Sequence, residues 1–171
     1  MLIDLLKKKK NAILEKWLHL IIETYPTDTA VLLKRERDQF LNPVGYTFSR
    51  EIEALFEGLL EGRGRSHFSA SLNQMIKIRS VQDFSPSAAV GFIFLLKKVV
   101  KDVLEGCFQG KAVIDEWLAF QSKIDDLALL AFDIYMECRE KISDIRVNEM
   151  RAQRDRAFEL MSRSGFHRDE Q

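Results

Sequence analysis

The sequence predicts an all-α fold. Its 171 residues include only three prolines, Pro26, Pro43 and Pro86, and each stands where an apolar pattern of helical period begins or ends. No stretch shows the period-two alternation of Val, Thr and Tyr that is typical of strands. From Lys111 to Ser164 there is neither glycine nor proline, so about 50 residues can form one helix of about 75 to 80 Å. We expect a bundle of about six helices with a long, protruding C-terminal helix.

The first expected helix covers residues 2–24. Its apolar residues recur at steps of three and four and form one buried stripe: Leu6, Ile13, Leu14, Trp17, Leu18, Ile21 and Ile22. Lys7 to Lys10 cross this helix as a solvated face, with weak contact to an anionic membrane surface as the alternative. After Tyr25-Pro26, Thr27 or Asp28 caps a second helix over residues 29–41, with Arg37 and Phe40 on its inner side.

Proline and glycine delimit the middle of the chain. Asn42-Pro43 starts a third helix, residues 44–60, because proline is tolerated in a first turn. The two glycines of Gly62-Arg63-Gly64-Arg65 end it. A short helix follows from Ser66 or Ser69 to about Ile78.

The next helix is expected over residues 85–108. Ser85 is a capping residue and Pro86 suits the first helical position. Val90, Ile93 and Phe94 place apolar side chains on more than one side, which indicates a helix in the centre of the domain. The uncharged run from Ala88 to Leu96 is too short to cross a bilayer.

The last helix changes character along its length. Up to Cys138 it is apolar on several faces, which is typical of a core helix. After Ile145 only a thin apolar seam continues among arginines. We therefore expect a helical domain at residues 1–140 and a projecting helix with a polar tail at residues 141–171. We expect Ile142, Ile145 and Met150 to pair with another chain.

Composition excludes several classes of protein. Twenty-six basic residues balance 26 acidic ones, so the net basic face of a nucleic-acid-binding protein is absent. Cys107 and Cys138 are expected to be reduced, buried thiols. The N-terminus lacks the charge order of a secretory signal and no segment is long enough to span a membrane. These features predict a cytoplasmic protein.

No constellation for catalysis or metal binding is found. His19, His67 and His167 lack metal-ligand spacing, and the adjacent acidic pairs, such as Asp125-Asp126, point to different helix faces. Arg63 and Arg65 are the pair that could contact an anion. We expect neither enzymatic activity nor a cofactor or metal.

Three segments resemble a known family. They are ILEKWLHLIIETYP (13–26), DQFLNPVGYTFSREIEALFEGLLEG (38–62) and IRSVQDFSPSAAVGFIFLLKKVV (78–100). Together they resemble the N-terminal domain of RsbRD-type proteins, co-antagonists of the RsbT kinase in bacterial stress signalling. The resemblance implies a globin-like sensor domain without haem that forms a homodimer and signals through its C-terminal helix. We expect no STAS domain after residue 171, so the resemblance implies a stand-alone module acting through a separate signalling protein.

Two alternatives remain open. A haem-binding globin-type sensor needs an axial ligand before the Ser85 helix, where SLNQMIKIRSV offers Met75 but no histidine. An adaptor docking on a membrane or redox complex would use Lys7 to Lys10 or the arginine-rich C-terminal segment. Under the sensor interpretation, Trp17, Phe94 and Trp117 are the expected walls of an apolar ligand pocket.

Overall fold

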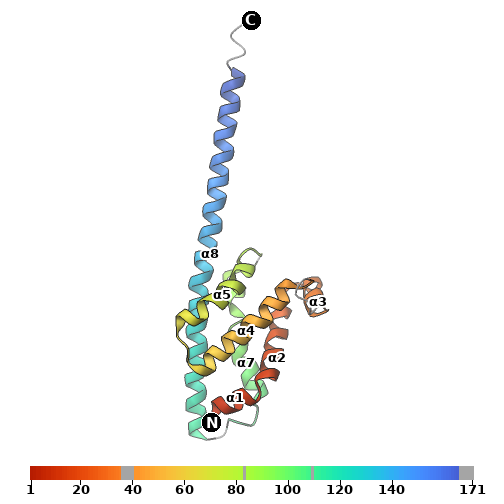
Figure 1. Cartoon of the computed structure of the whole chain (residues 1–171), viewed down its shortest axis with the longest axis vertical. Coiled ribbons are helices and arrows are strands. Elements are labelled where there is room, and N and C mark those ends of the chain that lie inside the picture. The colour runs from red at the N-terminus through yellow and green to blue at the C-terminus, as the bar shows by residue number, and fades with distance from the viewer. Residues whose placement is uncertain (36–40, 83, 109, 166–171) are drawn as a thin grey trace. The chain divides into compact units, whose positions relative to one another are not determined.

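The secondary structure of the described residues consists of helices joined by turns and short loops. The computed structural model describes residues 1–35, 41–82, 84–108 and 110–165, and within them no strand occurs (Figure 1). The helices are α1 (Leu2–Lys8), α2 (Lys10–Glu23), α3 (Thr27–Arg35), α4 (Pro43–Glu61), α5 (Arg65–Ser80), α6 (Pro86–Gly91), α7 (Leu95–Val103) and α8 (Lys111–Gly165). The all-α prediction and the long C-terminal helix are confirmed. Arg37, Phe40 and His167 lie outside the described residues.

The chain divides into two compact units, Met1–Tyr135 and Met136–Gln171. The first unit holds the buried core, in which α2 contacts α3, α4 and α7, and α4 packs along α5. Trp17, Phe48, Phe56 and Phe92 are among the largest fully buried side chains. In the second unit, α8 continues to Gly165.

The prediction of a single helix over residues 2–24 is wrong, because the structure has two helices there, separated at Lys9. This residue has φ −102° and ψ 10°, outside the helical region, although its N–H still bonds the Leu5 carbonyl at 3.0 Å. Lys10, the first residue of the second segment, makes tertiary contacts. Its ammonium donates to Glu53 at 2.6 Å and to Glu57 at 2.5 Å, both on α4. Lys10 therefore ties α2 to α4 and does not belong to a freely solvated lysine face.

The single helix predicted over residues 85–108 is also wrong. It is interrupted after Gly91, where the amides of Ile93 and Phe94 bond carbonyls three residues back, at 3.2 and 3.1 Å. The indole Nε1 of Trp17 donates to the carbonyl oxygen of Phe92 at 2.8 Å in the buried interior. A buried carbonyl released from the helical ladder needs such a donor, so Trp17 stabilises the interruption.

Phe94 lies on the outside of this turn, which corrects the prediction that it is buried. Its side chain is 46% exposed. The Lys97 ammonium lies 5.6 Å from the centre of its ring and 2.6 Å from Asp125 Oδ1 on α8. Phe94 thus contacts the ion-paired Lys97 at the surface and is not part of the core.

The first part of α8 is buried on one side only. Phe120, Ile124, Leu127 and Ala131 are buried, while a stripe on another face is exposed: Ile114, Leu118, Leu129 and Phe132. This part of α8 therefore contributes one face to the core, and apolar residues on another face are exposed. Ion pairs from Asp125 to Lys97 and from Asp133 to Arg65 hold it against α7 and α5. Among the described residues, no helix combines the length and apolarity that crossing a bilayer requires.

Candidate functional site

Two of the three sequence motifs meet at Arg79, near the end of α5. The Arg79 side chain is fully buried. Its Nε donates to the Ala89 carbonyl at 3.0 Å, and its Nη2 donates to the Ala88 carbonyl at 3.0 Å and to Thr24 Oγ1 at 3.1 Å. Arg79 therefore joins the end of α2, the end of α5 and the start of α6.

Three aromatic rings surround the guanidinium. Its central carbon lies 4.0 Å from the centre of the Phe84 ring, 5.2 Å from that of Tyr25 and 5.4 Å from that of Phe92. Such contacts are strongest when the cation is desolvated. Burial lowers the pKa of Arg79 and raises the pKa of Tyr25, whose phenol is in turn affected in the opposite sense by the nearby positive charge. No carboxylate among the described residues pairs with Arg79, and its Nη1 and the Tyr25 hydroxyl have no hydrogen-bond partner there.

The third motif forms the start of α4. Asn42 Oδ1 accepts from the Gly45 amide at 2.8 Å, and its Nδ2 donates to the Leu33 carbonyl at 2.9 Å, so Asn42 both caps α4 and holds α3. A β-carbon on Gly45 would lie 2.2 Å from Asn42 Nδ2. Glycine is therefore required at position 45 by the cap itself. The motif residues build the fold.

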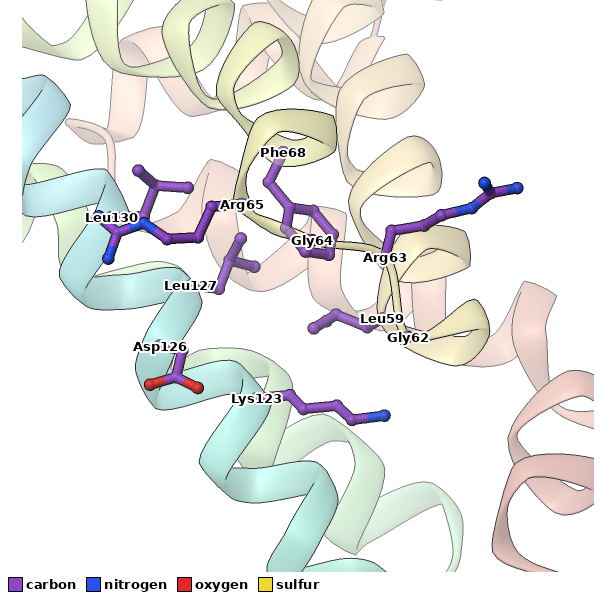
Figure 2. Close-up of a pocket in the computed structure, with 10 residues that line it drawn as sticks. All are labelled: Leu59, Gly62, Arg63, Gly64, Arg65, Phe68, Lys123, Asp126, Leu127 and Leu130. Atoms are coloured by element: carbon purple, nitrogen blue, oxygen red, sulfur yellow. The ribbon is translucent and has the colours of Figure 1, made fainter.

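A separate cavity of about 220 Å³ lies between the α4–α5 turn and the first unit's part of α8 (Figure 2). We call it the turn pocket. Its lining is Leu59, Gly62, Arg63, Gly64, Arg65, Phe68, Lys123, Asp126, Leu127 and Leu130. The four apolar side chains among these are buried, whereas Lys123 and Asp126 are exposed at its rim.

The turn has this shape because of Gly62. Its φ of 67° is left-handed, a conformation that glycine adopts without strain, and the Arg63 amide bonds the Gly58 carbonyl at 2.9 Å. Arg63 and Arg65 both have ion-pair partners. Arg63 donates to Glu61 at 2.8 Å, which lowers the pKa of that carboxyl, and Arg65 donates to Asp133 at 3.0 Å.

The predicted pocket residues do not meet in the turn pocket. Trp17 is fully buried in α2, and Phe94 is half exposed. Trp117 is partly exposed on α8, with its ring 5.5 Å from Phe108 and 6.2 Å from Phe120. A second cavity, of about 260 Å³, is lined by Phe120 but by none of the three. Their role as pocket walls stays a prediction.

The predicted partner residues lie in the second unit. Ile142 is partly buried, whereas Ile145 is 57% and Met150 69% exposed. At about 100° per residue, Ile145 and Met150 are about 140° apart around the helix. Met150 instead shares a sector of about 80° with other exposed apolar residues. These are Met136, Val147, Phe158 and Met161.

The histidines, cysteines and acidic residues were also compared as possible metal ligands. Within the described ranges, no cluster of three His, Cys, Asp or Glu side chains could hold a metal ion. His19 lies 2.9 Å from Glu23, and His67 packs edge-on against Phe68. Cys138 is buried as predicted, but Cys107 is exposed, so the prediction for Cys107 is wrong. Met75 is fully buried in α5.

The sequence indicated only one side of the turn pocket, the α4–α5 turn. Gly62-Arg63-Gly64-Arg65 stood out as a helix-ending turn with two cations. Lys123, Asp126 and Leu127 are about 60 positions further along, and their local pattern is that of any amphipathic helix. Their side of the cavity depends on how α8 packs, so no sequence signal marked it.

These features define an all-helical domain with an internal structural cluster at Arg79 and a small cavity against α8. A family model confirms the resemblance: the RsbT co-antagonist protein rsbRD N-terminal domain matches residues 11–150. The chain belongs to this family. No curated protein and no solved structure matches this chain.

Proposed function

We propose that this protein is a non-enzymatic sensory module of cytoplasmic stress signalling. It responds to a ligand or partner and relays the response along α8 to a separate signalling protein, as a homodimer. The observation that carries the proposal is the family match over residues 11–150, because the family is a signalling domain and the match extends into α8, as far as Met150. The globin-like form of the fold belongs to the same proposal.

The lining of the turn pocket supports a relay through α8. Lys123, Asp126, Leu127 and Leu130 of α8 form one wall, and the α4–α5 turn forms the other. An occupant that favours one separation of the two walls acts directly on α8. A relay requires two arrangements whose balance the input changes.

The exposed apolar stripe of the second unit supports pairing with a second copy. Met136, Val147, Met150, Phe158 and Met161 are all at least 41% exposed. An apolar stripe on a long helix is the feature by which helices pair in coiled coils. Ile145 lies on another face, so we assign the pairing to Met150 and the stripe.

The oligomeric state of the full-length chain tests the pairing. Met150→Glu and Phe158→Glu place charges in the stripe, so each should convert a dimer into a monomer in light scattering coupled to size exclusion. Leu160→Glu is the matched control, because Leu160 is 67% exposed but lies outside the stripe. The proposal would be contradicted if the protein stayed dimeric in both stripe variants. It would also be contradicted if Leu160→Glu lost the dimer to the same extent as the two stripe variants.

Hydrogen exchange in the same variants tests the relay. Coupling between two sites is reciprocal, so disrupting pairing should change amide exchange at the turn pocket, in residues 59–68. Leu160→Glu should leave that exchange unchanged. An unaltered pocket in monomeric Met150→Glu would separate pairing from sensing and would exclude the relay.

A further inference from the structure

The first unit's part of α8 carries an exposed apolar surface, which we call the first-unit face. Its four residues are between 43% and 63% exposed: Ile114, Leu118, Leu129 and Phe132. At about 100° per residue they share a sector of about 60°. The residues with which this part of α8 enters the core, such as Phe120 and Ile124, lie in another sector. Exposed apolar patches of this kind mark sites for other chains.

The first-unit face and the stripe of the second unit have the same spacing in opposite directions. Leu118, Leu129 and Phe132 are separated by 11 and then by 3 positions. The stripe repeats these intervals when it is read backwards from its C-terminal end, so two antiparallel copies of α8 bring apolar residues against each other at every matched position. The matched partners are Leu118 with Met161, Leu129 with Met150 and Phe132 with Val147. Ile114 and Phe158 lie within about one turn of the outermost pair.

Opposite charges occupy one further matched position. Asp125 precedes Leu129 by four positions, and Arg154 follows Met150 by four. In the antiparallel pair, Asp125 of one copy therefore faces Arg154 of the other, one turn beyond the contact between Leu129 and Met150. The two-fold symmetry of a homodimer forms this contact twice. The same register thus matches both the apolar residues and the charges of the two surfaces.

The same two charges disfavour parallel pairing. In a parallel pair in register each residue faces its own copy, so Asp125 would face Asp125 and Arg154 would face Arg154. Like charges placed opposite each other suppress a contact. Within one chain Asp125 pairs with Lys97 and Arg154 with Asp155, yet Asp125 is still 49% and Arg154 63% exposed, so both are accessible to a second copy. Because exposed ion pairs contribute little free energy, these charges determine the direction of pairing more than its strength.

We propose that two copies of this protein pair antiparallel along α8, so that the stripe of each copy binds the first-unit face of the other. This inference rests on the proposed function and deepens it, because it names the surface that the stripe binds. An input that moves the first unit's part of α8 in one copy then acts directly on the second unit of the other copy.

A charge placed in the first-unit face tests whether this face belongs to the interface. Leu129→Glu should convert the full-length dimer into a monomer as fully as Met150→Glu does, because the two residues face each other and an unpaired charge between them is unfavourable. Val81→Glu is the matched control, since Val81 is 73% exposed in the first unit but lies at the end of α5. Light scattering coupled to size exclusion gives the oligomeric state. A dimeric Leu129→Glu beside a monomeric Met150→Glu would overturn this inference and keep the proposed function.

Cross-linking tests the direction of pairing. Leu129→Cys and Met150→Cys are co-expressed with different tags in a Cys107→Ser background, in which the buried Cys138 is kept, and are treated with a short bismaleimide. Paired helices lie about 8 to 10 Å apart, so antiparallel pairing should give a cross-linked dimer that carries both tags. Leu129→Cys alone should give none, because 21 positions of helix, about 31 Å, would separate the cysteine from its own copy.

The control pair for the cross-linking is Asp126→Cys with Gln153→Cys. Both positions are exposed and lie at the same level of the antiparallel pair, but they are outside the two surfaces and should not cross-link. Cross-linking of Leu129→Cys to its own copy would show parallel pairing, which overturns this inference and keeps the homodimer of the proposed function. A parent protein that is monomeric would overturn both.

Discussion

Arg65 and Arg79 occupy opposite ends of α5 and have opposite environments. Arg65 is 68% exposed, pairs with Asp133 and borders an open cavity. Arg79 is fully buried, is surrounded by three aromatic rings and donates to two main-chain carbonyls and a hydroxyl. The comparison shows that the family motifs, which converge on Arg79 and Asn42, specify the fold. The turn pocket shares Leu59 and Gly62 with the second of these motifs, but its other lining residues lie outside all three motifs.

Arg79→Ala should have the largest effect on stability. It opens a cavity between the rings and leaves the Ala88 and Ala89 carbonyls without donors, so the free energy of unfolding should fall by about 3 to 5 kcal/mol. Arg65→Ala should lower it by less than about 1 kcal/mol, because exposed ion pairs contribute little. Urea unfolding of both variants measures the difference. Similar losses for the two arginines would contradict the contrast drawn between them.

Gly45→Ala should cost about 2 kcal/mol, because its β-carbon displaces the Asn42 side chain and both hydrogen bonds of the cap are lost. The atoms nearest the added carbon all belong to Asn42. In an Asn42→Ala background the same substitution should therefore cost much less. A double-mutant cycle by urea unfolding measures this coupling. Additive losses would show that the main chain, and not Asn42, excludes a side chain at position 45.

Gly62 and Gly64 should respond in opposite directions. Gly62→Ala forces a side chain into the left-handed region at φ 67°, which should cost about 1 to 2 kcal/mol. Gly64 precedes α5 with an extended backbone and without a side-chain cap. Gly64→Ser supplies a capping oxygen and should raise the free energy of unfolding by a few tenths of a kcal/mol. Thermal unfolding at neutral pH compares them; destabilisation by both would indicate that the whole turn is strained.

Tyr25→Phe should have a small effect at neutral pH, within about 1 kcal/mol, because the buried hydroxyl has no partner among the described residues. The effect should grow at high pH. Burial raises the pKa of Tyr25 above its usual value of about 10. The contribution of the neutral phenol to the free energy of unfolding is therefore complete below about pH 10, and it is lost as the pH rises through the folded-state pKa. The variant should therefore lose less stability than the parent between about pH 8 and about pH 11. Parallel melting curves across that range would contradict burial of the phenol.

The helix starts were predictable because their causes are local. Asn42 with Pro43, and Ser85 with Pro86, act within one turn of the helix that they begin, and α4 and α6 start at those prolines. The interruptions at Lys9 and after Gly91 were missed for the converse reason. Neither contains proline, and the residues that stabilise them, Glu53, Glu57 and Trp17, are 43 to 75 positions away.

The functional candidates follow the same division. The turn at Gly62 to Arg65 was recognisable from its glycines, but the opposite wall of the cavity was not, and Phe94 proved to be half exposed instead of buried. Arg79 gave no signal, because a charged residue is normally exposed. Its burial depends on acceptors and rings that come from α2, α6 and the segment before α6.

By itself the sequence determined the helical class, the starts of α4 and α6, the long helix α8 and the family. Helical period, capping and proline geometry act between residues that are near neighbours in the chain. Only the tertiary structure decided where helices are interrupted, which arginine is buried and which residues of α8 face the turn pocket. Those outcomes depend on burial and on hydrogen bonds between residues far apart in the chain, which become determined only when the helices pack.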